Sequence, residues 1–192
     1  KFPRGMRAFS DSLKSTAGLG LGIYTAHGNF TCQRYPGSLG HEARDVATYA
    51  SWNVVFVKND WCWRGEQNQT KHLAAFNKMR DAIVASGKAG QPMVYSIHWN
   101  FGDTPGPNCA RGVDCPLPKT ANMWRIGNDI RPDWTKAILR LIDTDTGHAG
   151  PENGVGVGSW NDADMPVKIR QSTFVQLWIG FSLPRNIALQ NP

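Results

Sequence analysis

The spacing of the apolar residues changes repeatedly along the chain, and this alternation constrains the fold more than any other feature. Apolar residues three or four positions apart predict helices at residues 3–14, 41–52, 69–86, 133–142 and 168–181. Short apolar runs between them predict buried strands at residues 19–24, 54–57 and 93–97, with briefer candidates at 124–127 and 155–158. Helices that alternate with single strands imply right-handed crossovers and a parallel sheet. We therefore predict one α/β domain over residues 1–192.

Composition and charge exclude several classes of protein. Hydrophobic residues make up 41% of the 192 positions and charged residues 19%, which is incompatible with intrinsic disorder. No apolar run is long enough to span a membrane, so no membrane partner is expected. The net charge of +6 is scattered singly and accompanies no nucleic-acid-binding motif, so we expect no nucleic-acid partner. The sequence predicts neither a cofactor nor a metal site, and it leaves the oligomeric state open.

The four cysteines form an even set, Cys32, Cys62, Cys109 and Cys115. Zinc binding is disfavoured because no CxxC pair or neighbouring histidine pair accompanies them, so disulfides are expected, with three connectivities open. Cys109 and Cys115 flank a Gly/Pro/Asp stretch within residues 100–120, which are predicted to form one long loop. Two sequons, which begin at Asn29 and Asn68, could accept glycans. Together these features favour a secreted protein, or one that follows another oxidising route such as the lysosomal one.

The candidate chemistry lies where the predicted strands end, because ligands bind at the carboxyl ends of parallel strands. The polar and aromatic residues at these positions are Tyr24, Lys58, Asp60, His98, Trp99, Arg125, Asp129, Trp160, Asp162 and Asp164. Aromatic faces stack on sugars and fixed charges bind hydroxyl groups, and two separate carboxylates are what glycoside hydrolysis requires. Asp133 is set aside as the N-cap of the helix that follows it. The other histidines are expected in core or solvated positions rather than in catalysis: His27, His41, His72 and His148.

Four stretches of the sequence also carry a family resemblance. They are residues 21–24 (Leu-Gly-Ile-Tyr), 36–42 (Pro-Gly-Ser-Leu-Gly-His-Glu), 58–62 (Lys-Asn-Asp-Trp-Cys) and 160–165 (Trp-Asn-Asp-Ala-Asp-Met). In order and spacing they resemble glycoside hydrolase family 27, the family of α-galactosidases (melibiases) and α-N-acetylgalactosaminidases. The resemblance extends from residue 2 to about residue 180, and the combination of motifs is specific.

This resemblance implies a (β/α)8 TIM barrel and retaining hydrolysis by double displacement. Asp60 stands at the family's nucleophile position and Asp129 at its acid/base position. Lys58 beside Asp60 would favour the ionised carboxylate that a nucleophile needs. The resemblance also implies a Cys32–Cys62 disulfide beside the pocket. It places further substrate-binding residues around the sugar, namely Tyr24, Cys32, Lys58, His98, Phe101, Arg125, Asp164 and Met165.

Departures from the family pattern bear on the substrate. His98 stands where the family commonly has Glu or another residue that helps to read the C2 substituent of the sugar, and Phe101 lies nearby in sequence. We therefore expect α-galactosidase activity first, with β-L-arabinopyranosidase or α-N-acetylgalactosaminidase activity as alternatives. Asn59 replaces the family's usual Tyr or Phe. Ile97 and Ala121 stand where family members often carry cysteines, which fits loss of that whole disulfide. A Cys109–Cys115 bridge would instead close the long loop.

The chain is shorter than the barrel that it resembles. Family barrels begin with two strands before the first helix predicted here, and the second of them ends in an acidic pair that holds the sugar. The eighth strand also finds no good match at the other end. We therefore expect an incomplete barrel of five or six strands. The alternative to an active glycosidase is a catalytically inactive sugar-binding remnant.

Overall fold

A computed structural model of the chain describes residues 2–62, 69–86, 93–99, 115–125 and 156–162. Helices and strands alternate along these residues in the order α1 (Gly5–Ala17), β1 (Leu21–Ala26), α2 (Glu42–Ser51), β2 (Val54–Asp60), α3 (Gln69–Ser86), β3 (Val94–His98), α4 (Leu117–Thr120), β4 (Met123–Arg125) and β5 (Trp160–Asp162). The helices predicted at 133–142 and 168–181 lie outside the described residues. None of the described helices combines the length and the apolar character that a membrane crossing requires.

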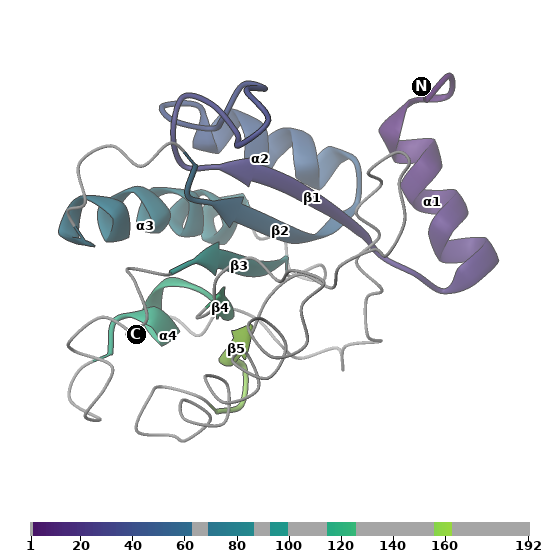
Figure 1. Ribbon diagram of the computed structural model, residues 1–192. Coiled ribbons are helices and arrows are strands. Elements are labelled where there is room, and N and C mark those ends of the chain that lie inside the picture. The colour runs from purple at the N-terminus through teal and green to yellow at the C-terminus, as the bar shows by residue number, and fades with distance from the viewer. Residues whose placement is uncertain (1, 63–68, 87–92, 100–114, 126–155, 163–192) are drawn as a thin grey trace, which may run out of the picture.

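The strands form one parallel sheet in which each strand pairs with the next strand of the chain, so the order is β1-β2-β3-β4-β5. Figure 1 shows the strands side by side, with α2 and α3 packed against each other along one side of the sheet. This consecutive order is that of a (β/α)8 barrel, in which each strand is followed by a helix on the outside. The described strands are an open part of such a barrel, as the sequence predicts.

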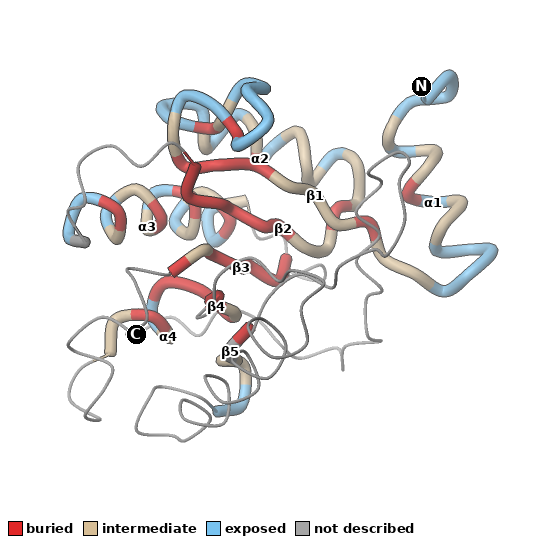
Figure 2. The backbone as a smooth tube through the Cα atoms, in the orientation of Figure 1, coloured by how far each residue is buried: buried red, intermediate tan, exposed pale blue. Residues whose placement is uncertain are grey.

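The hydrophobic core lies between the sheet and its helices. Val57 of β2 and Ile97 of β3 are fully buried and cluster with Val46 of α2 and with Phe76 and Met79 of α3. Burial of each side chain of this kind stabilises the fold by about 1.5–3 kcal/mol. Figure 2 shows that the buried backbone runs through neighbouring strands, while exposed residues lie on the outer faces of the helices. The helical spacing in the sequence therefore identifies the correct core faces of α2 and α3.

Strand β1 begins and ends two residues later than predicted. Gly18 adopts a φ of 66° and donates its N–H to the Lys14 carbonyl at 3.1 Å, while the Leu19 N–H reaches the Leu13 carbonyl at 3.3 Å. Leu19 therefore belongs to the end of α1, because such bonds satisfy the last carbonyls of a helix. The middle of β1 is only partly buried, so the prediction of a fully buried strand is wrong there.

The other boundaries show where apolar patterns stop being informative. The predicted bounds of α3 are matched, but β2 and β3 extend past their apolar runs to Asp60 and His98, because these polar residues still pair with the neighbouring strands. The predicted loop at 100–120 is wrong at its end, where α4 tolerates Pro118 in its first turn. Strand β5 follows the predicted segment 155–158, in which Gly156 forms only an isolated bridge with Ser159.

Candidate active site

Polar side chains from several strands lie on one face of the sheet, near its carboxyl end. The register aligns residues in two rows, because paired residues of parallel strands point to the same face. One row contains Tyr24, Lys58 and Ser96. The next row lies two residues further along the strands. It contains Asp60 of β2, His98 of β3, Arg125 of β4 and Asp162 of β5. The sheet therefore gathers most of the described residues that the sequence assigns to the site.

Asp60 is the centre of this arrangement. Its Oδ2 accepts a hydrogen bond from the Tyr24 hydroxyl at 2.5 Å. Its Oδ1 accepts one from the Trp61 N–H at 2.8 Å and one from Nδ1 of His98 at 2.6 Å. Because a carboxylate oxygen accepts hydrogen bonds, Nδ1 of His98 is the protonated ring nitrogen in this contact. Both carboxylate oxygens are therefore held in place by donors from β1, from β3 and from the residue that follows β2.

These contacts decide the protonation state of Asp60. Burial alone would raise its pKa, but the hydrogen bonds from His98 and Tyr24 and the charge of Lys58 outweigh burial and lower the pKa below the ordinary range of an aspartate. The carboxylate is therefore ionised at neutral pH although it is almost inaccessible to solvent. An ionised, oriented and desolvated carboxylate is chemically suited to attack an electrophilic carbon.

Lys58 carries the neighbouring positive charge. Its side chain is 1% exposed, and its Nζ lies 3.5 Å from Oδ2 of Asp162 and 3.3 Å from Oγ of Ser96. Burial lowers the pKa of this lysine, and the nearby carboxylates of Asp162 and Asp60 act in the opposite direction. The site therefore contains a buried cation between two buried carboxylates.

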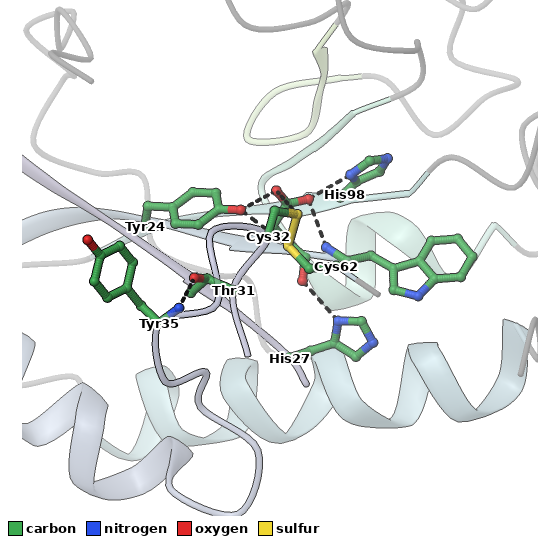
Figure 3. The surroundings of a disulfide bond; sticks show 9 residues. Tyr24, His27, Thr31, Cys32, Tyr35, Cys62 and His98 are labelled. Atoms are coloured by element: carbon green, nitrogen blue, oxygen red, sulfur yellow. Dashed lines mark hydrogen bonds and ion pairs between the residues drawn. A yellow bond between two sulfur atoms is a disulfide. The ribbon is translucent and has the colours of Figure 1, made fainter. Parts of the chain in front are cut away.

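A disulfide between Cys32 and Cys62 borders Asp60, as Figure 3 shows. Sγ of Cys32 lies 3.7 Å from Oδ2 of Asp60, and the Tyr24 oxygen lies 3.4 Å from Sγ of Cys62. A disulfide sulfur has no proton to donate, so the first distance is a packing contact rather than a hydrogen bond. The bridge ties the loop after β1 to the residue two positions beyond Asp60.

The same three residues, Cys32, Asp60 and Cys62, place potential metal ligands within 4.8 Å of one another. The two sulfur atoms are bonded to each other, so neither is the thiolate that a metal would need. Within the described ranges no other such group of three comes together. This cluster is therefore a disulfide beside a carboxylate and not a metal centre.

Several predicted site residues lie outside the described residues, namely Asn68, Phe101, Cys109, Asp129, Asp164 and Met165. Cys115 is disulfide-bonded, and its predicted partner, Cys109, lies outside the described residues. Asn29 is exposed at the start of its sequon, in the loop that the Cys32–Cys62 bridge anchors. Arg125 is 2% exposed beside His98 in the sheet register.

Sequence reasoning missed three polar residues next to the site. Ser96 contacts Lys58, and strand alternation could have found it, because it lies two residues before His98 on the same face. His27 and His72 form a buried pair, with Nε2 of the first 2.9 Å from Nδ1 of the second. They are 45 positions apart, so nothing in their spacing reveals the contact.

The state of Asp60 predicts how stability responds to acid. A carboxyl group whose pKa is lowered by folding stabilises the folded state fully above its unfolded pKa, near 4, and loses this contribution as the pH falls. We expect the free energy of unfolding, measured in urea, to decrease below about pH 4. The Asp60→Asn variant should lose less stability over the same pH range. The difference is about 1.4 kcal/mol for each pKa unit by which folding lowers the pKa of Asp60. Asp81, 65% exposed, provides the matched Asp81→Asn control, which should keep the wild-type slope. An identical slope in Asp60→Asn would contradict the assignment.

The consecutive parallel strands, with a buried ionic site at their carboxyl ends, define the chain as part of a (β/α)8 barrel. The sequence profile described as alpha galactosidase A matches residues 1–173, and the chain belongs to that family. The resemblance drawn from the four sequence motifs, to glycoside hydrolase family 27, is thereby confirmed.

Individual relatives agree with this assignment. The chain is 39% identical over 174 residues to alpha-galactosidase A of Cellvibrio japonicus, an alignment that covers 85% of this chain and 39% of the relative. It is 33% identical over 167 residues to alpha-N-acetylgalactosaminidase of Rattus norvegicus, covering 86% and 38%. The solved structure of α-galactosidase from Saccharomyces cerevisiae with raffinose is 27% identical, with a TM-score of 0.67, covering 90% of this chain and 40% of that one. The chain thus spans about two fifths of the length of these relatives.

Proposed function

We propose that this chain carries the nucleophile and the acid/base of a retaining glycosidase that removes terminal α-galactosyl residues. The observation that supports this most directly is the ionised carboxylate of Asp60 at the carboxyl end of β2, which accepts three hydrogen bonds. Membership of the alpha galactosidase A family supports the substrate class. The relative solved with raffinose, an α-galactoside, is consistent with it.

In the proposed reaction, an Asp60 oxygen attacks the anomeric carbon while the bond to the leaving oxygen breaks. Asp129 protonates that oxygen, so the leaving group departs as an alcohol. Asp129, now a carboxylate, then takes a proton from water, whose oxygen attacks the same carbon and displaces Asp60. Two inversions give net retention, and both carboxyl groups return to their starting states.

The other predicted residues would bind the sugar around this centre. Tyr24, Lys58 and Arg125 bring polar groups to the face of the sheet that holds Asp60. His98 donates to the carboxylate of Asp60, so a sugar hydroxyl near it would compete with this bond. We propose Cys32, Phe101, Asp164 and Met165 as the remaining binding residues, as the family resemblance implies.

A panel of three substrates tests the proposal and separates its alternatives. We expect this chain to hydrolyse p-nitrophenyl α-galactoside faster than the α-N-acetylgalactosaminide and the β-L-arabinopyranoside. The first sugar released, observed by proton NMR before mutarotation, should be the α anomer. Release of the β anomer would exclude the retaining mechanism. Binding of galactose in calorimetry without hydrolysis of any of the three would establish the sugar-binding remnant instead.

We also propose that the protein matures in an oxidising compartment and is secreted or follows a lysosomal-like route. The Cys32–Cys62 disulfide supports this, because disulfides are rare in reducing compartments. The exposed Asn29 sequon is compatible with glycosylation. Mass measurement of the native protein before and after glycosidase and reductant treatment would test both modifications.

Removing the Tyr24 hydroxyl should weaken the nucleophile without removing it. Hydrogen bonds to charged groups contribute about 1.5–3 kcal/mol, so Tyr24→Phe should lower kcat/KM by about 10- to 100-fold. The pKa of Asp60 should rise, moving the acid limb of the pH–rate profile to higher pH. Tyr35, which is 71% exposed in the loop after β1, offers the matched Tyr35→Phe control, which should behave as wild type. Equal activity of the two variants would remove Tyr24 from the site.

A further inference from the structure

The main-chain carbonyl of Asp60 is held as firmly as its carboxylate. It accepts a hydrogen bond from the N–H of His27 at 3.1 Å and a second from Nδ1 of the same residue at 2.9 Å. His27 directly follows β1, and its ring is buried beneath the disulfide in Figure 3. One residue therefore fixes the last residue of the neighbouring strand through two donors.

The contact with the Asp60 carbonyl determines which nitrogen of His27 carries the proton, and this in turn determines the tautomer of His72. A carbonyl oxygen can only accept, so Nδ1 of His27 is the donor to Asp60. In a neutral ring the other nitrogen, Nε2, is then an acceptor, and it lies 2.9 Å from Nδ1 of His72. His72 must therefore donate from Nδ1. The pair is consistent with only one arrangement of protons when both rings are neutral.

Packing keeps this pair in place. The His27 ring lies 4.8 Å from the ring of Phe76, and the His72 ring lies 4.2 Å from that of Trp61, measured between centroids. Phe76 and His72 both belong to α3, so the helix outside the barrel is coupled to the end of β2 through His27. Both histidines are 9% exposed, which leaves little room for the rings to turn.

Burial and nearby charges also favour a neutral His27 ring. Burial lowers the pKa of His27 most, and the nearby His72 and His98 lower it further, while the hydrogen bond to Asp60 and the Asp60 charge act in the opposite direction. A second proton on the His27 ring would make Nε2 a donor, so Nε2 could no longer accept the hydrogen bond from Nδ1 of His72. The arrangement that holds the Asp60 carbonyl is therefore the one expected at neutral pH.

We propose that His27 is a positioning residue for the nucleophile, held by His72 in the ring tautomer that donates to the Asp60 carbonyl. This inference rests on the proposed role of Asp60 as nucleophile. Its reason is geometric, because a misplacement of about 1 Å between reacting groups can cost about 100-fold in rate. Neither histidine contacts the carboxylate oxygens of Asp60 among the described hydrogen bonds, so the effect acts through the backbone.

Two substitutions of His27 separate positioning from simple packing. His27→Leu keeps the apolar volume and removes both ring hydrogen bonds. His27→Asn places an amide N–H close to where Nδ1 lies and can still donate to the Asp60 carbonyl. We expect His27→Leu to lower kcat on p-nitrophenyl α-galactoside about 10- to 100-fold per folded molecule, with KM changed less than about twofold. His27→Asn should recover kcat to within about threefold of wild type.

Nitrogen NMR of the histidine rings supplies a readout that does not depend on turnover. Both His27 and His72 should be neutral and protonated on Nδ1 at pH 7. A His27 ring protonated on Nε2 would overturn the proposal, as would a His27→Leu variant with wild-type kcat. Equal losses in His27→Leu and His27→Asn would also overturn it. An Asp60→Asn variant assayed beside them distinguishes failure of the His27 proposal from failure of the proposed function. Full activity of that variant would refute the proposed function itself.

Discussion

Asp60→Asn should reduce kcat/KM for p-nitrophenyl α-galactoside by at least about 10³-fold. The substitution replaces the ionised carboxylate that forms the glycosyl-enzyme bond in the proposed reaction with a neutral amide, which is a poor nucleophile, so the covalent route is lost rather than slowed. The wild-type chain, quenched during turnover and digested, should yield a peptide containing Asp60 with one added hexose mass. The variant should yield none.

The variant is expected to fold, which makes its activity informative. Asparagine has the shape of aspartate, and its Oδ1 can still accept from the Trp61 N–H and from His98. Burial of an amide also costs less than burial of a charge. The matched control is Asp81→Asn, an identical change at a side chain that is 65% exposed on α3. If Asp60→Asn kept more than a tenth of wild-type activity while Asp81→Asn was unaffected, Asp60 would not be the nucleophile.

The helices were predictable because the spacing of their apolar residues extends over many positions. In α3, large apolar residues recur at helical spacing at positions 73, 76, 79 and 83, and the predicted bounds match the structure. The strands carry shorter signals that stop where the site begins. Val57 ends the apolar run of β2, but the strand continues through Lys58 to Asp60, polar residues that are buried and still pair with β1. The polar residues of the candidate site thus interrupt the apolar pattern, so the predicted strands end before the real ones do.

The candidate site was predictable only in part, for a similar reason. Strand order places Tyr24, Lys58 and His98 at the carboxyl end of the sheet, and the structure brings all three to Asp60 or its neighbours. Spacing alone left three disulfide connectivities open. The family resemblance selected Cys32–Cys62, and that bridge is present. Contacts such as His27 with His72 depend on how α3 packs against the residue that follows β1, which no local pattern encodes.

Lys58→Met should destabilise the folded chain by about 3–5 kcal/mol. Removing one partner of a buried ion pair leaves the other charge without compensation in a medium that solvates it poorly. Lys58 and Asp162 are 1% and 7% exposed, and their charged atoms lie 3.5 Å apart. The measurement is the free energy of unfolding in urea at pH 7. The exposed pair formed by Arg7 and Asp11, whose side chains are 56% and 52% exposed, should lose less than about 1 kcal/mol in Arg7→Met.

The double variant Lys58→Met/Asp162→Asn determines whether the loss arises from the uncompensated charge. With both charges removed, most of the stability should return, because the pair itself gains little over neutral groups of similar shape. A double variant no more stable than Lys58→Met would instead assign the loss to packing around the lysine stem or to the Ser96 hydroxyl, which lies 3.3 Å from Nζ. Hydrolysis should not return with stability, because the cation that helps to keep Asp60 ionised is absent from both variants. Recovery of folding without recovery of turnover would therefore separate the structural role of Lys58 from its role in the site.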